Sequence, residues 1–177
     1  MKGILICLVV LIGINLASAT FLGAHNAKRR LPYAANMRAM VWNRELATMA
    51  RNWASKCIKG HNPNRRSSRF SSVGENIFWS SNSRTPGAAV NAWYSERQYY
   101  NYASNSCSRT CGHYTQVVWA NSEYLGCARQ RCSNFYIYVC NYGPAGNFSG
   151  QKPYVRGRRC SRCPRGYRCF NNLCVRR

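Results

Sequence analysis

The sequence predicts an α+β fold, with a layered domain over residues 20–150 and a small module over residues 151–177 that disulfides hold together. Three features lead to this prediction. Apolar residues recur at helical spacing in the first half, whereas β-branched and aromatic runs separated by turn residues fill much of the second half. The chain contains 11 cysteines. Its composition changes at Gln151, where basic residues and cysteines replace aliphatic ones.

Residues 1–19 are predicted to be a signal peptide. Lys2 gives a positive start, Ile4–Leu16 is an apolar run of 13 residues, and Ala17-Ser18-Ala19 is typical of a cleavage site. The run is shorter than the ~20 residues that a membrane-spanning helix needs. We therefore expect a secreted protein whose mature chain starts at Thr20.

The cysteines indicate the same oxidising compartment. Cys7 would leave with the signal peptide, and ten cysteines would remain. An even number in a secreted chain predicts five disulfides and no free thiol. The competing interpretation is a zinc site, because Cys160 and Cys163 have a spacing typical of zinc ligands.

Three helices are predicted before residue 100. The first covers residues 20–30. The second is capped by Asn43 and continues to about Lys59. The third opens with Thr85-Pro86, a cap followed by a first-turn proline, and reaches about Tyr99. The core face of the second helix is predicted from 3- and 4-residue steps to be Leu46, Met49, Ala50, Trp53, Ala54 and Cys57.

Three strands are predicted after Cys107, over residues 114–120, 124–130 and 135–142. Pro144 and Gly146 end the last of them. The tail from Gln151 holds nine basic residues, four cysteines and no carboxylate. Because it has too few apolar residues to fold by packing, disulfides are expected to hold it.

The charge of the chain is strongly positive. It has 26 Lys and Arg against four Glu and no Asp, which gives a net charge of +22. Such a field attracts polyanions, and the extracellular location favours anionic glycans or a membrane surface over specific binding of nucleic acid. The tail arginines expected to carry this binding are Arg158, Arg159, Arg162, Arg165 and Arg168.

Few residues are available for acid–base or metal chemistry. The chain has three histidines, four glutamates and no His-Glu-x-x-His motif, and the lack of Asp excludes Asp-dependent triads. No nucleophile has a recognisable catalytic context, so an enzyme is not expected. His25 is expected to be structural and Glu123 to be solvated in a turn. Glu45 is expected to lie in the first turn of the second helix, where a carboxylate interacts favourably with the helix dipole.

Several motifs carry a resemblance to a known family. They occur in the family's order over about residues 21–147, and they are Ala24-His25-Asn26, Cys57-x3-His61, Gly74-Glu75-Asn76-Ile77, Ala92-Trp93-Tyr94-Ser95-Glu96, Gly112–Ser122 and Ile137–Phe148. In these segments the chain resembles the CAP superfamily of cysteine-rich secretory, antigen 5 and pathogenesis-related proteins. The tail resembles the short cysteine hinge that follows many animal CAP domains.

The resemblance implies an α-β-α sandwich with a cleft that holds two histidines and two glutamates: His61, Glu75, Glu96 and His113. Two neutral imidazoles can bind Zn²⁺ or another divalent cation while carboxylates orient them. Two protein ligands make an open site, so no metal is expected to be required. The alternative interpretation is a purely structural polar network. The resemblance also implies the disulfides Cys57–Cys132, Cys107–Cys111, Cys127–Cys140, Cys160–Cys169 and Cys163–Cys174.

Two further sites are proposed. Several CAP proteins bind sterols or fatty acids, and Phe78 and Trp79 could line such a groove, although ordinary packing is the alternative. Asn147 begins an Asn-Phe-Ser sequon and could be glycosylated in a secreted chain.

Together these features predict a secreted, non-enzymatic CAP-domain protein that binds lipid or an anionic surface in defence or secreted-fluid biology. The alternative is an extracellular signalling or ion-channel-modulating ligand of a receptor protein. A secreted hydrolase that uses the four cleft residues is a weaker alternative, because no nucleophile has a recognisable catalytic context and Asp is absent. All three classes stay open, since the fold alone does not decide the function.

Overall fold

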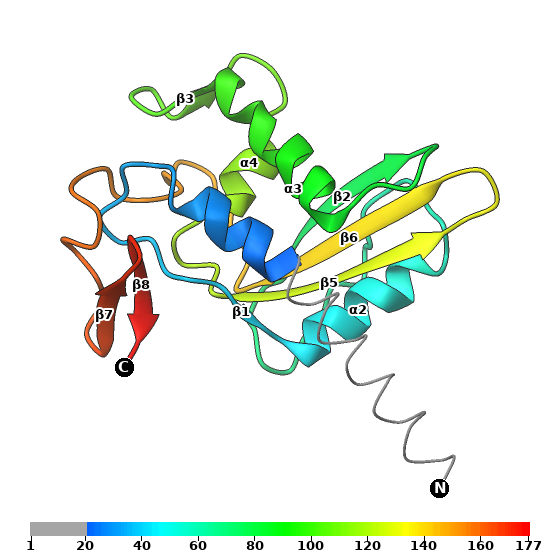
Figure 1. The fold of residues 1–177 in the computed structure, drawn as a ribbon, viewed down its shortest axis with the longest axis horizontal. Coiled ribbons are helices and arrows are strands. Elements are labelled where there is room, and N and C mark those ends of the chain that lie inside the picture. Colours follow the sequence, from blue (N-terminus) through cyan, green and yellow to red (C-terminus); the bar gives the residue numbers. More distant parts are fainter. Residues whose placement is uncertain (1–20) are drawn as a thin grey trace, which may run out of the picture.

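The computed structural model describes residues 21–177, so the predicted signal peptide lies outside the described residues. The described chain forms a three-layer α-β-α sandwich (Figure 1). Helix α2 (Arg44–Ala54) packs on strands β5 and β6 from one side of the sheet. The helix over residues 21–29, α3 (Pro86–Ser95) and α4 (Gly112–Val117) lie on the other side. The predicted α+β class and sandwich are therefore confirmed.

The central sheet has four strands in the order β1-β5-β6-β2. Strand β1 (Val41–Trp42) runs parallel to β5 (Tyr124–Arg131), and β6 (Tyr136–Gly143) is antiparallel to both β5 and β2 (Gly74–Ser80). A Cβ atom on Gly126 of β5 would lie 2.0 Å from the backbone nitrogen of Ala47. Glycine at this position therefore allows α2 to pack closely against the sheet.

Side-chain caps fix the starts of two helices as predicted. The Asn43 side chain accepts a hydrogen bond from the Leu46 N–H at the start of α2, and Thr85 accepts one from Ala88 at the start of α3. Helix α2 ends at Ala54, not near Lys59, and Cys57 then adopts a left-handed conformation with φ 54°. The third predicted helix also changes form, because residues Glu96–Tyr99 make a 3₁₀ turn.

One predicted element has the wrong type. Residues 114–120 were predicted as a strand, but Gly112–Val117 form helix α4. Both ends of this segment are satisfied by distant side chains: Glu96 accepts from the N–H groups of His113 and Tyr114, and Arg29 donates to the Val117 carbonyl. Several strands were not predicted, among them β2, which residues Gly74–Ser80 form beside β6.

Five disulfides cross-link the described chain, and they join the same pairs that the family resemblance implied. Cys107 belongs to the short hairpin of β3 (Tyr100–Asn101) and β4 (Ser106–Cys107).

Among residues 21–177, no helix has the length and apolar character needed to cross a bilayer.

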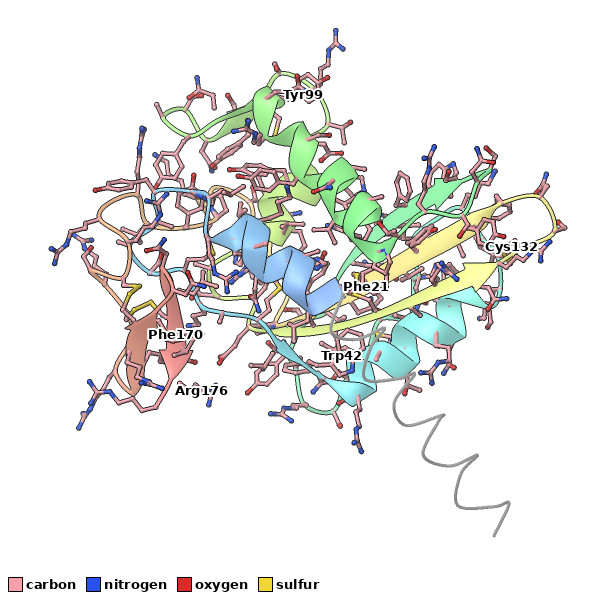
Figure 2. All side chains as sticks on the ribbon, viewed as in Figure 1. Phe21, Trp42, Tyr99, Cys132, Phe170 and Arg176 are labelled. Carbon is pink, nitrogen blue, oxygen red and sulfur yellow. A yellow bond between two sulfur atoms is a disulfide. The ribbon has the colours of Figure 1, made fainter. Side chains whose placement is uncertain are left out.

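The tail folds as a small hairpin of β7 (Tyr167–Phe170) and β8 (Leu173–Arg176), at the opposite end of the molecule from Cys132 (Figure 2). Leu173 is fully buried in the main core. The Cys174 N–H donates to the Met37 carbonyl, and the Cys174 carbonyl accepts from Ala39. The hairpin is therefore joined to the domain by core packing and backbone hydrogen bonds as well as by covalent continuity.

Glu123 is the anchor of this contact. It was predicted to be solvated, which is wrong: Glu123 is buried and accepts hydrogen bonds from Tyr167 and Arg176 of the tail. Tyr167 and Arg176 of the tail thus supply the hydrogen bonds that allow the Glu123 carboxylate to be buried.

Candidate functional site

The structure forms a cleft of about 310 Å³ beside strand β2. Its floor and walls combine imidazole rings with apolar side chains. The lining residues are Lys59, Gly60, His61, Ile77, Phe78, Trp79 and His113. Two of the four predicted site residues, both histidines, thus reach the same cleft. The two glutamates lie behind them, as the following contacts show.

The first histidine–glutamate pair joins a loop to the sheet. His61 Nδ1 lies 2.8 Å from Oε1 of Glu75, which β2 holds in a buried position. The same oxygen accepts the Asn62 N–H at 2.9 Å, and Oε2 accepts the Asn141 side-chain amide at 3.3 Å. Arg65 Nη1 lies 3.5 Å from Oε1. The carboxylate is thus fixed from several directions and orients the exposed His61 ring.

The second pair joins the end of α3 to the start of α4. His113 Nδ1 lies 2.7 Å from Oε1 of Glu96, and Oε2 accepts the backbone N–H groups of His113 at 3.0 Å and Tyr114 at 3.3 Å. A carboxylate at the first turn of a helix satisfies N–H groups that lack helical partners. Glu96 therefore both caps α4 and orients the imidazole.

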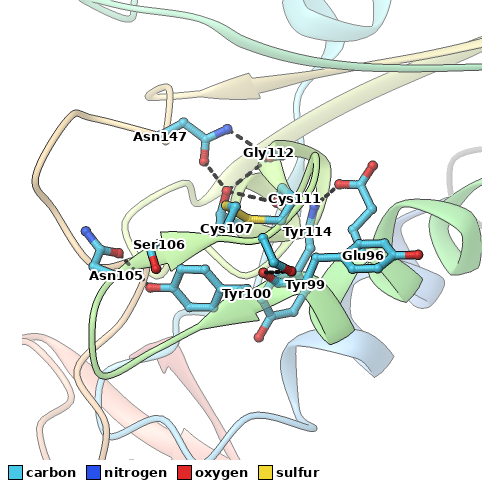
Figure 3. The surroundings of a disulfide bond; sticks show 12 residues. Glu96, Tyr99, Tyr100, Asn105, Ser106, Cys107, Cys111, Gly112, Tyr114 and Asn147 are labelled. Carbon is cyan, nitrogen blue, oxygen red and sulfur yellow. Dashed lines mark hydrogen bonds between the residues drawn. A yellow bond between two sulfur atoms is a disulfide. The ribbon is translucent and has the colours of Figure 1, made fainter.

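The Cys107–Cys111 disulfide lies directly before this helix (Figure 3). Cys111 is buried and immediately precedes Gly112. Asn147 holds the same turn from the other side, because its Oδ1 accepts from Thr115 at 2.7 Å and its Nδ2 donates to the Gly112 carbonyl at 2.9 Å. The amide nitrogen that a glycan would occupy is thus already engaged with α4.

The pairing leaves one nitrogen of each imidazole available. In the neutral form of each ring, the carboxylate that faces Nδ1 favours the tautomer with the proton on Nδ1, which leaves the lone pair on Nε2. Neither Nε2 atom makes a hydrogen bond with another described residue. Neutral imidazole nitrogens backed by carboxylates are suitable ligands for zinc and similar cations. Two such donors leave the remaining positions to water or a bound ligand.

A second group of potential ligands is ruled out by its bonding. The sulfur atoms of Cys160, Cys163 and Cys174 lie within 4.8 Å of one another. All three are engaged in disulfides, with Cys169 as the partner of Cys160 and the other two paired together. Oxidised sulfur cannot serve as a thiolate ligand, so the zinc alternative for the tail fails.

The aromatic wall of the cleft is partly open. Phe78 is half-buried and packs its ring 5.6 Å from that of Tyr138, whereas Trp79 is 47% exposed. Ile77 and Lys59 also line the cleft, and neither was proposed as a site residue from the sequence. Ile77 precedes Phe78 on strand β2, and this strand was not predicted from the sequence.

The remaining histidine is buried, whereas four of the five predicted tail arginines are exposed. His25 is fully buried, with Nδ1 2.8 Å from the Phe21 carbonyl and Nε2 2.8 Å from the Tyr142 hydroxyl, which fits a structural role. Arg159 donates to the carbonyls of Arg30 and Leu31. The other four predicted tail arginines are exposed: Arg158, Arg162, Arg165 and Arg168.

Comparison with known proteins places these features in a family. The model of CAP, the cysteine-rich secretory protein family, matches residues 22–142. GLIPR1-like protein 1 of Homo sapiens is 49% identical over 164 residues, which cover 85% of this chain and 68% of the human protein. Peptidase inhibitor 16 of Mus musculus is 40% identical over 168 residues, which cover 88% of this chain but only 33% of the mouse protein.

Solved structures agree with the sequence comparison. The crystal structure of NaASP2 with Zn²⁺ has a TM-score of 0.75 and 34% identity, covering 89% of this chain and 94% of that one. Hookworm Platelet Inhibitor has a TM-score of 0.69 and 28% identity, covering 89% of each chain. The similarity therefore extends over both the sheet and the helices that position the cleft.

Proposed function

The chain belongs to the cysteine-rich secretory protein (CAP) family, and on this premise we propose that it is a secreted, non-enzymatic binding protein that attaches to anionic surfaces. The five disulfides support an extracellular location, since such bonds persist in oxidising compartments. Anionic glycans and anionic lipids are the two candidate surfaces, and each presents the negative groups that arginine binds well.

One observation carries this proposal: the few carboxylates are used internally. Glu75 and Glu96 hold the cleft histidines, and Glu123 is buried under the tail. The remaining glutamate lies in the first turn of α2. Among the lysines and arginines of the described residues, only Arg38, Arg65 and Arg176 lie within 4.0 Å of a carboxylate, so most of the exposed Lys and Arg side chains have no acidic partner.

The cleft lining supports a binding role over catalysis. It offers imidazole, ammonium and apolar groups, but no hydroxyl or thiol among the described residues that line it. A histidine held by a carboxylate can act as a base only where a nucleophile lies within hydrogen-bond reach. This is why we place hydrolysis below binding among the possible functions.

We further propose that His61 and His113 hold a divalent cation, zinc being the first candidate. Zinc occurs in the crystal structure of NaASP2, a relative of the same fold. When bound, the cation would offer open coordination positions to an anionic ligand group. Glu75 and Glu96 would keep each ring oriented with Nε2 toward the cleft.

A second candidate function is binding of a sterol or fatty acid along the wall formed by Phe78 and Trp79. The partial exposure of Trp79 beside the cleft favours it. The volume of about 310 Å³ lies at the lower end of the ~300–1,000 Å³ typical of small-molecule pockets. Binding to a receptor protein is the alternative that remains if neither surface nor lipid is bound.

The test of surface binding uses the full chain, because Leu173 and Cys174 of the tail are buried. A variant with Arg158, Arg162, Arg165 and Arg168 changed to Gln should leave immobilised heparin at clearly lower salt than the wild type. The matched control changes Arg44, Arg51, Arg66 and Arg131, which are also exposed, and removes the same charge. Equal losses in both variants would show that net charge, not the tail, governs binding.

A further inference from the structure

Three large apolar side chains are exposed along one junction of the molecule. Leu31 is 54% exposed, Tyr33 is 53% exposed and Phe170 is 62% exposed. The first two follow the helix over residues 21–29, and the third ends strand β7 of the tail. Together with Arg30 and Arg159 they define what we call the tail junction.

Hydrogen bonds and a cation–π contact bring these separate segments together. Arg30 Nε donates to the carbonyl of Asn171, the neighbour of Phe170, at 3.1 Å. Arg159 donates to the carbonyls of Arg30 and Leu31, each at 3.1 Å, and its guanidinium lies 5.4 Å from the centre of the Tyr33 ring. Two arginines thus connect the backbone segments that carry the three apolar side chains.

The tail junction is rigid on the side of Phe170. The Cys160–Cys169 disulfide fixes the residue before it. Asn171 and Asn172 follow with φ values of 48° and 61°, which is the backbone of a tight type I′ hairpin turn. Leu173, which pairs with Phe170 across the hairpin, is buried in the core. Phe170 is therefore held in an exposed position by its neighbours.

All charged side chains of the tail are positive. The exposed Arg158, Arg162 and Arg168 lie on the same tail segments, and the tail contains no carboxylate. The nearest acid in the tail's own contacts is Glu123, which Arg176 and Tyr167 already occupy. Apolar and aromatic side chains among arginines are the composition of surfaces that lie in the interfacial region of a bilayer.

We propose that the tail junction docks on an anionic membrane. Leu31, Tyr33 and Phe170 would enter the headgroup region, while the exposed Arg158, Arg162 and Arg168 would bind lipid phosphates bidentately. This inference rests on the proposed attachment to anionic surfaces and names the surface. A sulfated glycan would satisfy the arginines equally well but would leave Leu31 and Phe170 in water, which is why membrane is favoured.

The test compares two variants of the full chain on two supports. One variant carries Leu31→Ala and Phe170→Ala. The control carries Ile58→Ala and Phe148→Ala, two residues of similar exposure outside the junction. Both are measured by co-sedimentation with vesicles of phosphatidylcholine containing phosphatidylserine, with pure phosphatidylcholine vesicles as a reference, and by salt elution from heparin.

We expect the junction variant to bind the anionic vesicles roughly tenfold more weakly, because apolar burial is lost, and the control to bind as the wild type does. Heparin elution should be unchanged in both, and melting temperatures equal to that of the wild type would show that both are folded. Equal vesicle binding by the junction variant and the wild type would overturn the proposal. Retention of the wild type on heparin without vesicle binding would also overturn it, while leaving attachment to glycans intact.

Discussion

The Glu123 carboxylate and the Arg176 guanidinium form a two-point contact, with Oε1 2.7 Å from Nε and Oε2 3.0 Å from Nη2. Glu123 directly precedes strand β5, whereas Arg176 ends β8, so the contact fastens the tail to the central sheet. Tyr167 adds a hydrogen bond to Oε2 at 2.7 Å. A residue that sequence patterns place in a solvated turn thus determines where the tail lies.

Replacing Glu123 with Gln should lower the free energy of unfolding by about 1–3 kcal/mol, since a buried group loses charge-assisted hydrogen bonds. Thermal melts of the two proteins at neutral pH measure the difference. Glu45→Gln is the control, because Glu45 is only half-buried in the first turn of α2. An E123Q protein that melts with the wild type would show that the contact contributes nothing.

This contact also has a defined pH dependence. Burial raises the pKa of Glu123, but the hydrogen bonds from Arg176 and Tyr167 together with the charges of Arg176 and Arg38 lower it more, so the pKa lies below its ordinary value of 4.5. A depressed carboxyl pKa stabilises the fold above pH 4.5 and loses this contribution as pH falls through the folded-state value. The difference in stability between wild type and E123Q should therefore narrow in acid.

His25 predicts a second loss of stability at a higher pH. Burial lowers the pKa of His25 from 6.5 to about 4, with the Phe21 carbonyl opposing and Arg29 adding to the shift. Between these values the unfolded chain binds a proton that the folded chain excludes, so stability falls as pH decreases from 6.5 to about 4. A His25→Gln variant should be less stable at neutral pH but should lack this slope. An unchanged slope in H25Q would assign it to other groups.

Trp79 is the residue that tests lipid binding in the cleft. Because it is 47% exposed, Trp79→Ala should leave the fold intact while removing apolar wall from the cleft. We expect the variant to bind a fluorescent fatty acid or sterol several-fold more weakly than the wild type. Ile58→Ala, a change at a similarly exposed residue outside the cleft lining, is the control. Equal affinity in all three proteins would contradict this role.

The sequence predicted the helix starts that depend on residues close together in the chain. The side chains of Asn43 and Thr85 each accept a hydrogen bond from the backbone N–H three residues later in the chain. Because donor and acceptor are so close in the chain, the sequence is enough to predict these caps. Helix α4 was read as a strand, since its β-branched and aromatic residues are buried by tertiary packing and its ends are satisfied by Glu96 and Arg29. Such distant partners are invisible to periodicity.

The cleft was predictable in its residues but not in its geometry. Motif resemblance identified both histidines and both glutamates, yet strand β2, which positions Glu75, was missed because Gly74, Glu75 and Asn76 have low strand propensity. Their polar groups are satisfied instead by specific partners, as in the bond from Asn76 to the His113 carbonyl at 3.1 Å. Pairing with β6 and these bonds override the local preference.

Zinc binding by the cleft gives the last prediction. If His61 and His113 hold the cation, saturating zinc should raise the melting temperature by a few degrees, because a ligand that binds only the folded state stabilises it. The shift should disappear in His113→Ala and in His61→Ala. It should also weaken in acid, since protons compete for the imidazole nitrogens.

Two further variants separate coordination from general effects of the cleft. Lys59→Ala changes the same lining without removing a ligand and should keep the zinc-dependent shift. Glu96→Gln should reduce zinc affinity by about 10–100-fold, because the carboxylate that orients His113 is lost while both ligands remain. A His113→Ala protein that responds to zinc as strongly as the wild type would rule out this site. The histidine–glutamate pairs would then serve to tie the loop at His61 and helix α4 to the sheet.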